Sequence, residues 1–211
     1  MVEPQTLLVF SLAVLALLIS PGPNMAFLLS HSISHGARGG LAVALGISVA
    51  DVVLTILTAT GISAMIATWP PFFDLLRCVG AFYLLWLAYK ALQAKGAVEI
   101  ESQKKMAISS IAWKAMLNSL FNPKALLFFM LFLPQFVNPA NASVAGQIII
   151  LGSVLTVVAL VFHALLGIFS GAIAGYVNRN SKFARFSAWM LATVFVALAS
   201  KLILLEKPSL K

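Results

Sequence analysis

Six long apolar stretches, separated by short polar or proline-containing connections, run through the 211 residues of the chain. A helix that crosses a bilayer needs about 20 mostly apolar residues, and each stretch is long enough. The pattern therefore predicts an all-α membrane protein with six transmembrane helices. The predicted spans are about Thr6–Ser34, Leu41–Thr68, Phe72–Leu92, Ile108–Phe136, Val144–Tyr176 and Phe183–Leu205.

The first and fourth spans are each interrupted by proline. Pro21-Gly22-Pro23-Asn24 lies inside the first, and Asn122-Pro123-Lys124 lies inside the fourth. Proline removes a backbone donor and clashes with the preceding helical turn. The polar groups left unpaired are costly in lipid unless protein, water or a ligand satisfies them. We therefore predict that helices 1 and 4 are discontinuous.

The two interruptions also suggest how the chain is divided. Pro23 and Pro123 lie 100 residues apart, which is close to half the length of the chain. The polar stretch 93–107 separates a first set of three spans, 1–92, from a second set, 108–211. Because three is odd, the second set enters the membrane from the opposite face, as in a 3+3 inverted repeat. Such repeats place substrate sites at interrupted helices near the middle of the membrane.

Composition agrees with a membrane protein. Apolar residues make up 61% of the chain and charged residues only 9%, whereas soluble proteins carry about 25% charge. The net charge of +8 does not indicate nucleic-acid binding, because basic residues concentrate in the connections on one side of the predicted membrane. We count nine Lys and Arg on that side against three on the other. The positive-inside rule makes 93–107 a cytoplasmic linker and places both termini outside.

Asp51 is the most informative single residue, because carboxylates inside membranes are expensive and usually functional. On a helix it forms one polar stripe with Ser48, Thr55 and Thr58, which predicts an interior cavity. We assign Asp51 to coupling, together with Arg77. A static ion pair of Asp51 with Arg77 or with the lysine after Pro123 is the alternative, and Arg77 is near enough to its span end to snorkel.

The residues around the two interruptions are the candidate substrate site. A helix that restarts at Asn24 presents free N–H groups to a carboxylate, although a simple packing kink is the alternative. Asn118 and Asn122 lie four apart on one helix face, from which they bond across helices or to a substrate. The candidate substrate-binding residues are Pro21, Gly22, Pro23, Asn24, Asn118, Asn122, Pro123 and Lys124.

The motifs of other function classes are absent. The single cysteine, Cys78, excludes an internal disulfide, and nucleotide-binding glycine loops and HExxH do not occur, so we expect no cofactor. His163 is solitary in its span, which favours structural hydrogen bonding or a proton relay over a metal site. His31 and His35 are expected to be solvated. Gly167, Gly171 and Gly175 permit close contact with another span or with a second subunit, which leaves a homodimer open.

Several ordered blocks carry a resemblance to one family: Ser20-Pro-Gly-Pro-Asn24, His35-Gly-Ala-Arg-Gly-Gly40 with Asp51, Gly80 to Leu92, Asn118 to Ala125, and Phe132-Leu-Pro-Gln-Phe136. Together they resemble the LysE/RhtB superfamily of amino-acid exporters, nearer its homoserine/threonine and leucine branch. The resemblance implies a secondary transporter, not an enzyme. Such a protein exports amino acids or related small metabolites across the bacterial inner membrane, by proton antiport with alternating access.

The resemblance places the family's Pro-Gly-Pro segment at 21–23, its acidic position at Asp51 and its Asn-Pro-Lys at 122–124. The expected partners are a small amino-acid substrate, protons and the lipid bilayer. Export of a metal cation is the main alternative, but it would need several carboxylates or a histidine cluster. A membrane-embedded enzyme would need a nucleophile–base pair or paired acids, which the chain lacks.

Overall fold

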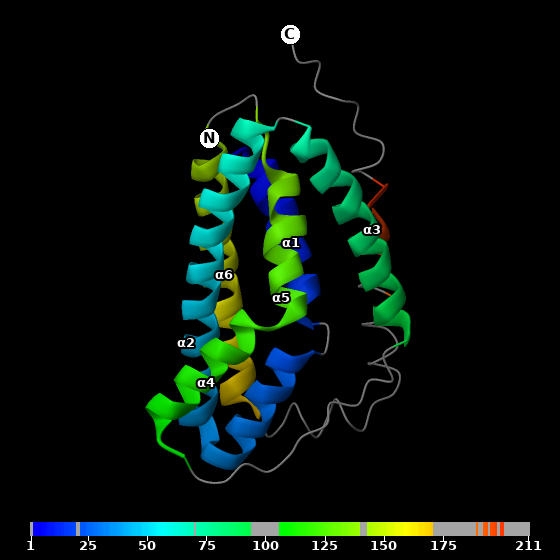
Figure 1. Ribbon diagram of the computed structural model, residues 1–211. Coiled ribbons are helices and arrows are strands. Elements are labelled where there is room, and N and C mark those ends of the chain that lie inside the picture. Colours follow the sequence, from blue (N-terminus) through cyan, green and yellow to red (C-terminus); the bar gives the residue numbers. More distant parts are fainter. Residues whose placement is uncertain are drawn as a thin grey trace.

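The computed structural model describes residues 2–19, 22–69, 71–93, 106–139 and 143–170, with scattered positions between 189 and 200. Every regular element within these ranges is helical (Figure 1). The elements are α1 (Pro4–Ile19), α2 (Pro23–Thr68), α3 (Phe72–Gln93), α4 (Ile108–Leu120), α5 (Pro123–Leu127), the π-helical turn η1 (Phe128–Phe132), the 3₁₀ turn η2 (Leu133–Phe136) and α6 (Val144–Ile168).

Two of these helices are long and apolar enough to cross a membrane, Pro23–Met65 within α2 and Val144–Ile168. A third candidate is the bent pair Ile108–Leu120 and Pro123–Phe136. The prediction of an all-helical membrane protein is confirmed. The six-span inverted repeat stays a prediction, because most of the sixth expected span, Phe183–Leu205, and most of the linker 93–107 lie outside the described residues.

Both predicted interruptions are present. Helix α1 ends at Ile19 and α2 begins at Pro23, after Gly22 in an extended conformation (φ −169°, ψ −179°). Proline suits the first position of a helix, because its missing N–H would have no intrahelical partner there. In the other half, the axis bends by 53° between Leu120 and Pro123. Helices 1 and 4 of the predicted scheme are therefore discontinuous.

The connection between the first two predicted spans differs from our expectation. We expected a loop containing Arg38, but the helical backbone continues through this region and only Gly36 departs from it (φ +65°, ψ −165°). The chain changes direction there, at the lower end of α2 in Figure 1. This backbone conformation is almost exclusive to glycine. One residue therefore makes the turn that we had assigned to a loop.

The surroundings of Gly36 correct a second expectation. We expected His31 and His35 to be solvated, yet His31 is buried with its ring centroid 4.3 Å from that of Phe27. The His35 Nε2 atom accepts a hydrogen bond from the backbone N–H of Met106 at 3.0 Å. The two histidines thus belong to the packing at this end of the helices rather than to a solvated connection.

Close backbone contacts hold α2 against α4 and α6. Three small residues four positions apart on α2 form a packing surface, because Ala42 and Ala50 are buried and Gly46 lies directly against the backbone of Ala112 on α4. On the α6 side, Gly40 touches Gly167. Small residues allow membrane helices to approach in this way. The large apolar side chains on the outer faces of these helices are exposed, as lipid contact requires: Leu45, Val49, Ile56, Val157, Val161 and Leu165.

Candidate functional site

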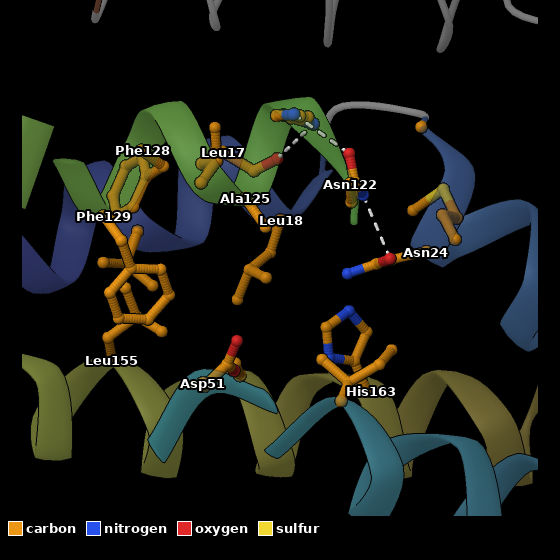
Figure 2. A pocket seen from close by; sticks show the side chains of 16 residues that line it. Leu17, Leu18, Asn24, Asp51, Asn122, Ala125, Phe128, Phe129, Leu155 and His163 are labelled. Carbon is orange, nitrogen blue, oxygen red and sulfur yellow. Dashed lines mark hydrogen bonds between the residues drawn. The ribbon is translucent and has the colours of Figure 1, made fainter. Parts of the chain in front are cut away.

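The two helix breaks meet through a network of amide side chains. The Nδ2 atoms of Asn118 and Asn122 donate to Asn24 Oδ1 at 2.9 and 3.0 Å, and Asn24 Nδ2 donates to Ser119 Oγ at 3.0 Å. Figure 2 shows the bond between Asn24 and Asn122. Of the two alternatives for Asn118 and Asn122, bonding across helices is therefore present. The network fastens the restart of the first broken helix to the end of α4.

Asn122 also explains why a new helix begins at Pro123. Its Oδ1 atom accepts the backbone N–H of Lys124 at 3.0 Å, so the side chain caps the N-terminus of α5. Asparagine is a preferred N-cap because its short side chain satisfies one of the donors left free at a helix start. Pro123 follows at the first helical position, where it costs no hydrogen bond. The Asn-Pro-Lys motif thus marks both the end of α4 and the beginning of α5.

The Lys124 side chain reaches across to the other break. Its Nζ atom donates to the carbonyl of Leu17 at 3.1 Å, in the last turn of α1, and lies beside Gly22. The last carbonyls of a helix lack intrahelical donors and carry a partial negative charge, so an ammonium group is favourable there. Lys124 therefore connects α5 to the end of α1 and also places a cation at the first interruption.

A cavity of about 70 Å³ lies between the two breaks and the helices α2 and α6. This volume holds several water molecules. Figure 2 shows polar side chains gathered at one end of it and Phe128, Phe129 and Leu155 at the other. The lining residues are Val14, Leu17, Leu18, Gly22, Asn24, Met25, Ile47, Asp51, Asn122, Lys124, Ala125, Phe128, Phe129, Leu155, Ala159 and His163.

Asp51 faces this cavity from α2, across from the broken helices (Figure 2). Its side chain is only 4% exposed. The rest of the predicted polar stripe is also buried, and the hydroxyls of Ser48 and Thr55 donate to carbonyls of their own helix. The Lys124 ammonium donates to the Leu17 carbonyl, and no ion pair between it and Asp51 is present among the described residues. A static pair with Lys124 is therefore not the reason for the buried carboxylate.

The predicted substrate residues divide into two groups. Gly22, Asn24, Asn122 and Lys124 line the cavity beside Asp51. The other three residues support the site without lining the cavity. Asn118 donates to Asn24, Pro23 begins α2 and Pro123 begins α5. Pro21 lies outside the described residues, and so does the side chain of Arg77, although its backbone belongs to α3.

Sequence reasoning missed part of the lining. It did not single out Phe128 or Phe129, which the π-helical turn η1 turns toward the cavity. Nor did it find that Leu155, Ala159 and His163 form one face of α6, although their spacing of four residues was a readable signal. The described residues contain no group of three or more His, Cys, Asp or Glu side chains that could hold a metal ion.

Many membrane transporters form their substrate sites where membrane helices are broken. Residues 15–206 match the family model described as LysE type translocator, and the chain belongs to this family. It is 32% identical over 195 residues to the leucine efflux protein of Salmonella choleraesuis (strain SC-B67), covering 90% of this chain and 91% of the relative. The leucine efflux protein of Enterobacter sp. (strain 638) is 32% identical over 191 residues, 88% of this chain and 89% of the relative. No solved structure matches the chain.

Proposed function

We propose that this chain exports amino acids with apolar side chains across the bacterial inner membrane, in exchange for protons and by alternating access. The family and the relatives named as leucine efflux proteins support amino-acid export. The observation that carries the mechanism is the cavity at the junction of the two helix breaks, which has a cationic and amide end, a carboxylate and an apolar end.

The substrate carboxylate would lie at the restart of the first broken helix. Pro23 has no N–H, and Ala26 N already donates to the Gly22 carbonyl at 3.0 Å. The backbone N–H groups of Asn24 and Met25 belong to the first turn of α2, where a regular helix supplies no acceptor. The positive end of the helix dipole and the nearby Lys124 ammonium add to the attraction of a carboxylate.

The substrate ammonium would face Asp51, the one carboxylate among the lining residues. A protonated Asp51 no longer attracts an ammonium group, so proton uptake from the outside would release the amino acid there. The empty carrier would then return with the proton and deliver it to the cytoplasm. Arg77, on α3, is proposed to favour the charged form of Asp51 in one of the two states. The helix breaks provide the places at which the walls of the cavity separate.

The apolar end selects the substrate side chain. Phe128, Phe129 and Leu155 offer only apolar surface, and a polar side chain placed there would lose its hydrogen bonds to water. The small volume of the cavity favours aliphatic side chains over aromatic ones. This agrees with the substrate that the names of the curated relatives state, and it disfavours threonine and homoserine.

Counterflow in proteoliposomes tests the proposal. Vesicles loaded with unlabelled amino acid take up labelled leucine through a working carrier, and competition by isoleucine, phenylalanine, threonine and lysine gives the preference. The same vesicles are run with and without a pH gradient. We expect leucine counterflow, strong competition only by aliphatic amino acids, and accumulation driven by the pH gradient. Absence of exchange with every amino acid would refute the function.

Asp51→Asn separates exchange from coupling. We expect this variant to lose accumulation driven by the pH gradient. Ser48→Ala is the matched control, because Ser48 lies one turn earlier on the same helix face and its hydroxyl donates to the Ala44 carbonyl of its own helix. Undiminished accumulation by Asp51→Asn would remove Asp51 from coupling while leaving amino-acid export intact.

A further inference from the structure

His163 is a buried polar side chain that the proposed transport cycle has not used. It lies on α6, is 4% exposed and lines the cavity. Its Nδ1 atom is fully buried and has no hydrogen-bond partner among the described residues. Figure 2 shows the imidazole ring directed into the cavity next to Asn24, on the same wall as Asp51. An unpaired buried polar atom is destabilising unless something else satisfies it.

The packing of α6 keeps the ring at this place. Gly167, one turn after His163, lies so close to Gly40 that a Cβ on Gly40 would come within 2.6 Å of the Gly167 Cα atom. Further back along α6, Gly152 lies directly against the Thr55 side chain. These two contacts fix α6 against α2 on both sides of His163. His163 is therefore held at a fixed place along the wall of the cavity.

The neighbouring amides are already committed to each other. A side-chain amide oxygen accepts two hydrogen bonds, and Asn24 Oδ1 receives both, from Asn118 and Asn122. Asn122 Oδ1 accepts the backbone N–H of Lys124. Asn24 Oδ1 therefore has no capacity left for an imidazole N–H, and Asn122 Oδ1 is turned toward the start of α5. The amide network does not satisfy the Nδ1 atom of His163. A neutral imidazole always carries one N–H donor, and the ring lines the cavity, so this donor is available to a ligand there.

We infer that His163 donates a hydrogen bond to the carboxylate of the bound amino acid, so that the site requires a free carboxylate. This rests on the proposed function and adds a ligand from α6 to the groups at the two helix breaks. A carboxylate is the substrate group that only accepts hydrogen bonds, and a charged acceptor forms a stronger bond than a neutral amide. His163 thus makes the polar end of the cavity specific for amino acids over their amides.

The inference is tested by comparing leucine with leucinamide, which keeps the ammonium and the side chain but lacks the charged carboxylate. His163→Leu fills the space without a donor. Loss of a hydrogen bond to a charged group corresponds to about 10- to 100-fold, and loss of one to a neutral group to about 2- to 10-fold. We expect the KM for leucine to rise by the larger factor, the inhibition constant of leucinamide by the smaller one, and the maximal rate to change little.

Two further variants keep the test decisive. His163→Asn places an N–H close to the position of Nδ1 and should restore much of the affinity for leucine, whereas His163→Gln displaces the donor and should restore less. This difference remains measurable even if His163→Leu does not insert. Thr156→Val is the control on the same helix, because the Thr156 hydroxyl donates to the Gly152 carbonyl at 2.8 Å and the residue is absent from the cavity lining.

Equal changes for leucine and leucinamide in His163→Leu would overturn the inference, because a merely structural role weakens both ligands alike. A KM for leucine that matches the Thr156→Val control would overturn it as well. In both cases the wild-type protein still exchanges leucine and the proposed function stands. If the wild-type protein exchanges no amino acid, the proposed function itself fails and the inference fails with it.

Discussion

Removal of Asn24 tests the idea that the two helix breaks are fastened together by amide side chains. Asn24→Ala deletes three hydrogen bonds at once, to Asn118, Ser119 and Asn122. Hydrogen bonds between membrane helices contribute about 0.6 kcal/mol each on average. The three together predict a loss of about 2 kcal/mol, or roughly 4–8 °C in the melting temperature of a chain of this size.

Neighbouring variants provide a graded series. Asn118→Ala removes one bond of the network and should lower the free energy of unfolding by about 0.6 kcal/mol. Asn122→Ala removes one network bond and the N-cap of α5, for a loss of about 1.6 kcal/mol. Thr60→Ala is the control, because its exposed hydroxyl donates to carbonyls of its own helix.

The measurement is the fraction of detergent-solubilised protein that stays monodisperse in size-exclusion chromatography after heating. The expected order of melting temperatures is Thr60→Ala, Asn118→Ala, Asn122→Ala and then Asn24→Ala as the lowest. If Asn24→Ala is no less stable than Asn118→Ala, the breaks are held together by packing rather than by the amide network. The description of Asn24 as the centre of the junction would then be wrong.

Three further predictions concern the turn, the cation and the apolar end. Gly36→Ala places a side chain at φ +65° and should destabilise the protein by about 1–3 kcal/mol. Gly61→Ala is the control, because a side chain there meets open space on a helix and should not destabilise the protein. Equal melting temperatures of the two variants would contradict the strained turn. Lys124→Met leaves the Leu17 carbonyl without this donor and removes the cation beside the first break. The KM for leucine in counterflow should therefore rise at least tenfold, and unchanged kinetics would exclude Lys124 from the site. Phe129→Ala enlarges the apolar end and should shift competition in counterflow toward phenylalanine; an unchanged preference would mean that Phe129 does not select the side chain.

The positions of the helix breaks followed from the sequence because they are local events. Proline cannot donate a hydrogen bond wherever it lies in a fold, and a Pro-Gly-Pro segment cannot continue a regular helix. The bounds of the predicted fourth span, Ile108–Phe136, coincide with α4 through η2. The burial of Asp51 was also predictable. A carboxylate within an apolar membrane span is too costly to face lipid, so it is expected to face the protein interior.

The turn at Gly36 was not predictable in the same way. The sequence His35-Gly36-Ala37-Arg38 carries a glycine and charge, which suggested a solvated loop. In the structure, packing buries His31, and His35 accepts a hydrogen bond from Met106, seventy-one positions along the chain. These contacts between distant residues stabilise helical backbone on both sides of Gly36, the one described residue with a positive φ.

The sequence by itself determined that the chain is helical and lies in a membrane, where its helices break, and which charged residues lie within the spans, because each of these depends on a residue and its near neighbours. Only the tertiary structure decided which side chains meet. It joined Asn24 to three partners more than ninety positions away, directed Lys124 to the end of α1 rather than to Asp51, and brought His163 into the cavity. Hydrogen-bond partners depend on distance in space, and the packing of α2 against α4 and α6 sets that distance.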